Sequence, residues 1–504
     1  MSMDTAADRL LKRYHKARER RSVWEAHWRE CYEYVLPQRQ DFLRHGSAGD
    51  KGGDRLFDGT AADAVDQLAA SLMAHLTPPW ARWFGLAPGR GIGPEDREAV
   101  APALERAAET IQSHMDRSNL AVEMHQCYLD LVTCGTASLM FEEAPLGETS
   151  AFRFTAVPLA DLVVEEGTTG KLDVTFRRSL LTVAALRERF PEAVLSDELL
   201  RRAKDDPDLR LALIEAVIPE GHGHAYTALL NGEEAADAWD SAPGKEAVVL
   251  AEGRFAASPF INFRWLKAPG EAYGRSPVMK ALPDIKTANK VVELVLKNAT
   301  IAVTGIWQAD DDGVLNPANI KLIPGTIIPK AVGSAGLTPL EAPGRFDISQ
   351  LVLTDLRARI RHALLVDQLG QIASPRMTAT EILERAAEMA RILGATYGRL
   401  QSELLTPLIL RAVAILRRRG EIPPLRVDGH LVNIQYRAPL AQAQAHQDAQ
   451  STLSWLEAVG AMGPEAAATV DMAAAARWLG RTFGVPGALI RERTPDTIPG
   501  SPLQ

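Results

Sequence analysis

Cysteine is scarce in this 504-residue sequence, which contains Cys31, Cys127 and Cys134. An odd number of cysteines without a paired spacing argues against a disulfide framework and fits a reducing compartment. A secretion signal is also missing, because the sequence passes from Met3 straight into a charged helical segment without an apolar core. We therefore expect the protein to remain in the compartment where it is made.

Long hydrophobic runs are absent as well. The longest stretch free of formal charge, Gln67–Ala81, is interrupted by Pro78 and Pro79. It falls short of the roughly 20 apolar residues that a helix needs to cross a bilayer. The sequence predicts no transmembrane helix and no membrane partner.

An excess of positive charge is lacking too. The 56 Lys and Arg residues are outnumbered by 64 Asp and Glu, which gives a formal charge of −8. Proteins that bind nucleic acid through its phosphates are usually basic, so any contact with DNA is expected to be weak, local or repulsive. The 46% apolar and 24% charged residues are typical of globular proteins, and the length suggests two to four modules.

Motifs for catalysis, cofactors and metals are the last absence. Gly167–Lys171 resembles a phosphate loop, but Leu172 stands where Ser or Thr would be required, so a turn is predicted. Other candidates are interpreted as core or turn residues: His125, Cys127 and Cys134 in an apolar helix, and His222 and His224 in a polar turn. The sequence therefore predicts no enzyme, no cofactor and no metal site.

Helical periodicity dominates the first part of the chain. Residues 5–36 form one predicted helix, whose cationic face we interpret as solvated: Arg9, Lys12, Arg13, Lys16, Arg20 and Arg21. Further predicted elements are helices over Thr60–Leu76, 95–117 and 120–134, strands over Ala137–Phe141 and Phe152–Val157, and β-like runs at Leu172–Phe176, Ile214–Ile218, Ala247–Leu250 and Phe260–Trp265. The predicted fold class is α+β, mainly α.

Two helices flanking a Gly/Pro-rich insert follow. Ser276 and Pro277 are typical of a helix start, although we expect Pro283 to delay the regular helix to about 284. The helix 284–300 carries an apolar seam (Ile285, Ala288, Val292, Val295 and Ala299) and a face with Lys286, Lys290 and Lys297. The insert 301–346 favours strands, for instance Ile301–Trp307 and Thr326–Ile328, and a second helix is predicted over 347–369.

A very long helix is predicted over 379–419, after the loop 370–377. Its apolar stripe has a mean step close to the 3.6 residues of an α-helix, and Gly420 ends it. Pro407 predicts a kink because it removes a backbone donor. Residues 438–488 are Ala-rich and predicted to be helical.

Three segments, taken in order, carry a family resemblance: LFDGTAADAVDQLAASLMAHLTPPWARWFGL from Leu56 to Leu86, EAYGRSP from Glu271 to Pro277, and RMTATEI from Arg376 to Ile382. Together they resemble the portal, or head-to-tail connector, proteins of short-tailed double-stranded DNA phages. The resemblance implies the portal fold and a dodecameric ring with a central DNA channel at one capsid vertex of the virion. DNA would be packaged and later ejected through it.

The resemblance also implies a division of the chain. Residues 1–276 and 379–437 would form the wing, 277–300 and 347–369 the stem helices, 301–346 the clip, 370–378 the tunnel loop, and 438–504 the crown and tail. Implied partners are the major capsid and scaffolding proteins, the terminase large subunit, tail adaptor proteins and non-specifically passing double-stranded DNA. The ring would nucleate procapsid assembly in the host cytoplasm.

Site candidates follow from this division. For the DNA channel and tunnel loop they are Lys286, Lys290, Lys297, Gln371, Ser374 and Arg376, and for the clip interface Trp307, Asp310, Asp311 and Asp312. A surface ion pair between neighbouring subunits is the alternative for each cation. Twelve copies at −8 carry −96, so DNA is expected to slide past an acidic wall. The alternative functions are a packaging-associated nucleic-acid enzyme and a cytosolic helical scaffold unrelated to virions.

Overall fold

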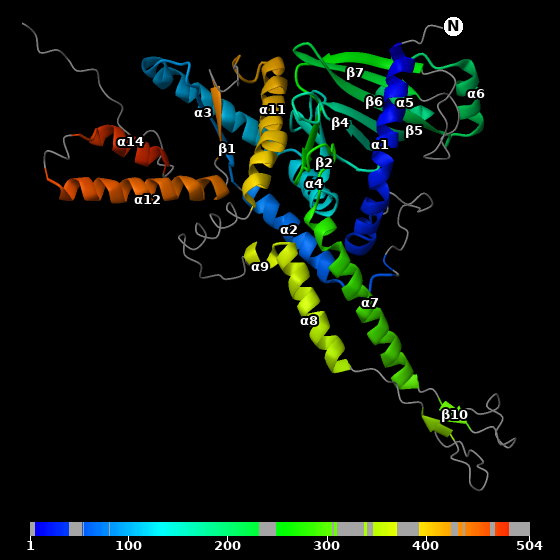
Figure 1. Ribbon diagram of the computed structural model, residues 1–504. Helices are drawn as coiled ribbons and strands as arrows, with labels where there is room; N and C mark the ends of the chain where they lie inside the picture. Colours follow the sequence, from blue (N-terminus) through cyan, green and yellow to red (C-terminus); the bar gives the residue numbers. More distant parts are fainter. Residues whose placement is uncertain are drawn as a thin grey trace, which may run out of the picture.

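The computed structural model describes residues 6–39, 53, 55–79, 81–230, 248–304, 307–309, 337–339, 346–369, 393–424, 432–436, 439–463 and 469–482. Over these residues the chain is a mixed α and β protein in which helix predominates, as the sequence predicts. A body of helices and sheets carries a pair of helices that projects from one end (Figure 1).

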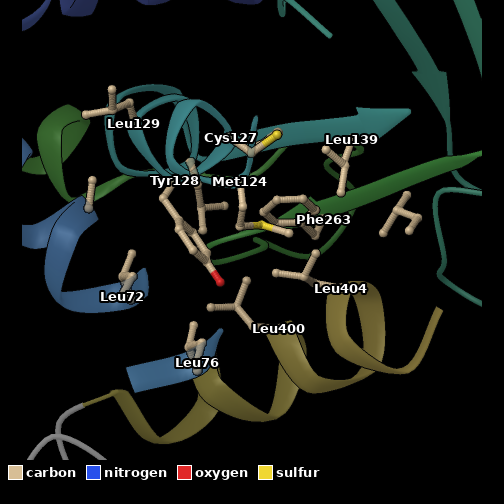
Figure 2. Packing of buried hydrophobic residues seen from close by; sticks show 14 of the residues in the cluster. Leu72, Leu76, Met124, Cys127, Tyr128, Leu129, Leu139, Phe263, Leu400 and Leu404 are labelled. Atoms are coloured by element: carbon tan, nitrogen blue, oxygen red, sulfur yellow. The ribbon is translucent and has the colours of Figure 1, made fainter. Parts of the chain in front are cut away.

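The body is built around helix α4 (Leu120–Cys134), which is buried over most of its length. Helices α1 (Ala6–Val35), α2 (Thr60–Leu76) and α3 (Pro94–Asp116) surround it, and all four confirm the sequence-predicted helices. Figure 2 shows side chains from α2, α4 and a strand meeting Leu400 and Leu404 of the long C-terminal helix. Residues far apart in the sequence thus share one core.

Two larger antiparallel sheets pack into the body. The first has the order β3-β2-β9, from β2 (Thr136–Glu143), β3 (Phe152–Val157) and β9 (Phe260–Arg264), all three near the predicted positions. The second has the order β4-β5-β6-β7-β8, from β4 (Leu162–Glu165), β5 (Val174–Thr182), β6 (Arg210–Glu220), β7 (Gly223–Leu230) and β8 (Val248–Phe255). Two short helices, α5 (Val183–Arg189) and α6 (Asp197–Asp205), lie between β5 and β6 in the chain.

The sequence located these strands only in part. β4, β7 and the two short helices were not predicted, and the strand expected from Leu172 begins at Val174 because residues 167–171 form a turn. In that turn Gly170 has a φ of +78°, which glycine adopts readily. The predicted turn at Gly167–Lys171 is therefore confirmed.

The projecting pair consists of α7 (Pro277–Thr304) and α8 (Phe346–Ala363), which pack lengthwise against each other (Figure 1). The regular helix starts at Pro277, so the expected delay to 284 is wrong. Pro283 lies exposed on the outer side while Val278, Leu282 and Ile285 are buried in the core. Packing on the inner side outweighs the single hydrogen bond that Pro283 cannot donate.

The elements that follow α7 and α8 differ from the prediction. Residues 301–304 continue α7, so the predicted strand from Ile301 is wrong, and β10 (Trp307–Ala309) instead pairs with β11 (Leu337–Pro339). The predicted single helix 347–369 is also wrong: α8 ends at Ala363, and α9 (Val366–Leu369) follows. Leu365 between them has a left-handed φ of +61°, which breaks the helix.

The long helix runs through the described residues 393–419, where α11 (Thr406–Arg419) follows a π-helical segment at Gln401–Leu405. The π segment ends two residues before Pro407, the position of the predicted kink. Leu400, Leu404 and Leu408 of the predicted stripe are buried, and Gly420 ends the helix with a φ of +73°. The part of this helix predicted over 379–392 lies outside the described residues.

The remaining elements close the body and extend from it. β12 (Val432–Tyr436) pairs with β1 (Phe84–Pro88), which joins the C-terminal part of the body to the segment after α2. In the described part of the Ala-rich region, α12 (Pro439–Ala461) and α14 (Met472–Thr482) are helical and extend to the side of the body opposite α1 (Figure 1).

Candidate functional site

The structural site that the sequence motifs build is the junction where the projecting pair meets the body. Ser276 begins it: its Oγ accepts a hydrogen bond from the Met279 N–H at 2.9 Å and donates to the Thr133 carbonyl at 2.8 Å. One side chain therefore caps α7 and ties its start to the end of α4. The predicted N-cap is confirmed.

A close approach of two backbones explains the glycine in EAYGRSP. A Cβ added to Gly274 would lie 2.0 Å from the carbonyl oxygen of Gly135. Gly135 itself has a φ of +78°, and its carbonyl accepts from the Trp265 N–H at 2.9 Å. The loop that enters α7 thus fits against the α4–β2 turn only because neither residue has a side chain.

The aromatic residue of the same motif anchors α1. Tyr273 is buried, its ring packs edge-on against Trp28 at 5.0 Å between centroids, and its hydroxyl accepts from the Val164 N–H at 3.2 Å. Burial raises the pKa of Tyr273 to about 12, so the hydroxyl stays protonated. Arg275 pairs with Glu271 and places its guanidinium 5.2 Å from the ring centre of Trp24.

A buried ion pair connects the same loop to the long helix. Arg264 is fully buried and binds both carboxylate oxygens of Glu403, at 2.7 and 3.2 Å. The Arg264 guanidinium also donates to the carbonyls of Ala272 at 2.9 Å and Gly170 at 2.8 Å. Because removing either partner would leave buried hydrogen-bonding groups without their main partner, the pair fixes the arrangement of the segments that it joins.

Glu403 lies at the centre of the π segment. At its end, the Thr406 N–H binds the Gln401 carbonyl, five residues back. The π segment ends at Leu405, two residues before Pro407, which has no N–H to continue an α-helical ladder. The kink expected from the sequence is thus accommodated by a local change of helix type, held in place by Arg264.

The LFDGT segment clamps both projecting helices to α2. Asn289 of α7 is buried; its Oδ1 accepts from the N–H groups of Phe57 at 2.6 Å and Asp58 at 3.1 Å, and its Nδ2 donates to the Arg55 carbonyl at 2.8 Å. The Asp58 carboxylate binds Arg357 of α8 at 2.8 Å. Sequence reasoning missed Asn289, whose only signal was a polar residue beside an apolar seam.

The charge on Asp58 is stabilised in this clamp. Burial alone would raise its pKa, but hydrogen bonds from the side chain and the N–H of Thr60 and from Arg357 outweigh it and lower the pKa of Asp58 below its usual range. A second ion pair, between Arg359 and Asp284 at 2.9 Å, joins α8 to α7.

The three lysines predicted to face the channel are exposed, and each pairs with a glutamate of its own chain. Lys286 contacts Glu30 of α1 at 3.2 Å, while Lys290 and Lys297 contact Glu293 at 2.9 and 2.5 Å. The two lysines lower the pKa of Glu293 to about 2, so it stays charged. Each lysine thus has an ion-pair partner within its own subunit, and Glu293 is shared by two of them.

Most of the other predicted site residues lie outside the described residues. They are Gln371, Ser374, Arg376, Asp310, Asp311 and Asp312. Trp307 begins β10, and its backbone pairs with Pro339, but its side chain is likewise outside.

The described part of the chain offers no candidate metal centre. No group of three or more His, Cys, Asp or Glu side chains there could hold a metal ion. Burial raises the pKa of the Cys127 and Cys134 thiols well above their usual range, as expected for core residues. No helix among the described residues is long and apolar enough to span a bilayer.

Comparison with known proteins places these motifs in a family. A family model described as bacteriophage head to tail connecting protein matches residues 7–490. A probable portal protein of Bordetella phage BPP-1 is 26% identical over 496 residues, covering 95% of this chain and 87% of the relative. The portal protein of Salmonella phage epsilon15 is 24% identical, covering 93% and 86%, and that of Escherichia phage T7 is 22% identical, covering 83% and 76%. The chain therefore belongs to the family of bacteriophage head to tail connecting proteins.

Proposed function

We propose that this chain is a viral portal protein. Copies of it form the head-to-tail connector at one vertex of a bacteriophage capsid, and double-stranded DNA passes through their central channel. The observation that carries the proposal is the family match over residues 7–490, supported by relatives named as portal proteins over most of the chain.

The structure supports this function with a projecting helical pair that is fixed firmly to the body. A tube wall built from several subunits needs each subunit to present its helices at a constant angle. Three contacts at the junction limit movement of the pair relative to the body: the capped start of α7, the Asn289 clamp and the Arg264–Glu403 pair. We infer that α7 and α8 line the channel as stem helices, and that β10 and β11 belong to the clip.

The finer assembly is part of the proposal. Twelve subunits form the ring, the clip docks the terminase large subunit during packaging and tail adaptor proteins later, and the ring nucleates the procapsid in the host cytoplasm. No catalytic step is assigned to the chain.

Electron microscopy of the purified full-length protein tests ring formation. Rings with a central hole are expected, and their rotational symmetry gives the subunit number. A monodisperse monomer at all concentrations and salt conditions would refute the proposed function.

A deletion of residues 370–377 tests the expected tunnel loop. We expect rings to assemble as before, because the clamps described above involve none of these residues, while packaging or retention of DNA falls. Replacing the same residues with a Gly/Ser segment of equal length is the matched control for chain length. Normal packaging by the deletion variant would rule out a tunnel-loop role.

A further inference from the structure

A cationic ridge on α1 has no role in the function described so far. Arg9, Arg13, Lys16 and Arg20 step by 4, 3 and 4 residues, so they share one face of the helix. All four are exposed, and α1 forms one flank of the body (Figure 1). At about 1.5 Å rise per residue, the ridge is roughly 16 Å long.

The ridge concentrates positive charge in an acidic chain. The fourteen residues from Asp8 to Arg21 contain seven Lys or Arg and two acids, a net charge of +5, whereas the whole chain carries −8. Glu165 of β4 contacts Arg13 at 2.7 Å and Arg20 at 3.7 Å. Exposed pairs of this kind contribute little and exchange partners easily, so both arginines remain available to an anion.

Packing of α1 does not require these cations. Its opposite face buries Leu11, Tyr14 and Ala17 against the five-stranded sheet, in a cluster with Val163 and Phe176. Arg21, by contrast, has a structural role. It is buried, so the solvated position expected for it is wrong. Its guanidinium donates to the carbonyls of Ala160 and Leu162, each at 2.7 Å.

Among the residues that the structure describes, two ridge cations have no ion-pair partner. Within the described ranges, no acidic side chain lies at ion-pair distance from Arg9 or Lys16. A regular row of exposed cations raises the local positive potential, which attracts anions to this face of the helix.

The form of the ridge favours a nucleic acid over a protein as that anion. Protein interfaces depend on buried aromatic or apolar anchors with a polar rim, whereas the apolar residues between these cations already face the sheet. Duplex DNA carries one charge per about 1.7 Å of its axis, so every cation of a straight row can find a phosphate.

We propose that the α1 ridge binds the phosphate backbone of double-stranded DNA without sequence preference, as a contact surface on the body separate from the lysines of α7. The inference does not depend on ring closure, because each chain carries its own ridge. The α7 lysines are weaker candidates, since each of them has a glutamate of the same chain at ion-pair distance.

The test measures the affinity of the full-length protein for a 30-base-pair duplex as a function of salt. The variant carries Arg9→Gln, Lys16→Gln and Arg20→Gln. Because each phosphate contact contributes about 0.9 to the slope of log K against log salt, the slope should become shallower by about 2.7. If the variant and the wild type bind equally at 1 M salt, the variant should bind up to roughly 500-fold more weakly than the wild type at 0.1 M salt.

A matched control separates a local contact from a change in net charge. Arg106→Gln, Arg117→Gln and Arg201→Gln remove three exposed charges scattered over α3, its C-terminal end and α6. This control should keep the wild-type slope to within about one unit. Circular dichroism of all three proteins checks that the variants are folded.

Two results would overturn the proposal. One is an unchanged slope in the ridge variant. The other is an equal loss of DNA affinity in the ridge and control variants, which would show that binding depends only on net charge. If the ridge variant keeps its DNA affinity but no longer enters capsids, the ridge instead contacts an acidic protein surface. Sedimentation of the same samples reports ring formation separately, so a failure of the proposed function is distinguishable.

Discussion

At the scale of single residues, the junction depends on positions where no other side chain fits. Gly274 is the strongest case, because its neighbour is a backbone carbonyl that cannot rotate away. Asn289 is the second, because one amide satisfies two N–H groups and one carbonyl that folding removes from water.

We expect Gly274→Ala to destabilise the protein by about 3 kcal/mol or more, at the upper end of overpacking effects. Urea unfolding of the purified variant measures the change. Gly394→Ala in the long helix is the control: no atom lies within 4 Å of its added Cβ, so a gain of about 0.5–1 kcal/mol is expected. A loss smaller than about 1 kcal/mol for Gly274→Ala would contradict the close approach.

Asn289→Ala should cost about 1–3 kcal/mol for each N–H group that it leaves without a partner. Thermal unfolding at neutral pH checks this value. Asn298→Ala lies on the same helix and is only partly buried, so a change within about 0.5 kcal/mol is expected. Equal effects at both positions would argue against the clamp.

Asp58 predicts a dependence on pH. Its folded-state pKa is lowered, so its contribution to stability is present above the unfolded value of about 3.9 and is lost as pH falls through the folded pKa. Asp58→Asn should therefore destabilise the protein at pH 7, and the difference from wild type should shrink below about pH 4. A difference that stays constant from pH 7 to pH 3 would exclude the ionised carboxylate as its source.

At the scale of elements, proline acts differently in the two helices that contain it at this site. In α7 the surrounding apolar residues hold Pro283 within a continuous helix. In the long helix Pro407 coincides with a π segment, whose Glu403 is bound by Arg264. Proline is therefore accommodated within a regular helix in α7, whereas in the long helix it lies next to a change of helix type.

Pro283→Ala should stabilise α7, because alanine restores a donor toward the Met279 carbonyl and proline in a helix interior costs about 3 kcal/mol. The expected gain, up to that value, can be read from urea unfolding. Pro102→Ala, exposed in the interior of α3, should behave in the same direction. A destabilised Pro283→Ala variant would show that the proline has a packing role.

At the scale of the whole molecule, charge and shape separate the functions of its parts. Each lysine of the projecting pair contacts a glutamate of the same chain, either Glu293 of α7 or Glu30 of α1, which suits a wall past which DNA slides. Among the described residues, the four exposed cations of the α1 ridge have one carboxylate partner between them, that of Glu165, and therefore suit a longer-lasting contact with DNA phosphates.

The triple variant Lys286→Gln, Lys290→Gln and Lys297→Gln should therefore change stability little, because exposed ion pairs contribute about 0–1 kcal/mol each. The slope of log K against log salt for duplex binding should differ less from wild type in this variant than in the α1 ridge variant. Titration of duplex into both variants at several salt concentrations provides the comparison. A larger effect from the α7 lysines would reverse the assignment of the two surfaces.

The sequence by itself determined the elements whose signals are local. The periodicity of α1, α2, α3, α4 and the long helix, the cap at Ser276 and the stop at Gly420 depend on residues within a few turns of one another. The three family segments likewise sufficed to suggest the portal role.

Only the tertiary structure decided where those elements meet. The Arg264–Glu403 pair joins residues 139 apart, and the Asn289 clamp spans more than 230 positions. The break at Leu365 and the helical course of 301–304 also ran against local expectation. Burial of one face and the pairing of distant polar groups set these features, because their free energy comes from partners that no local pattern contains.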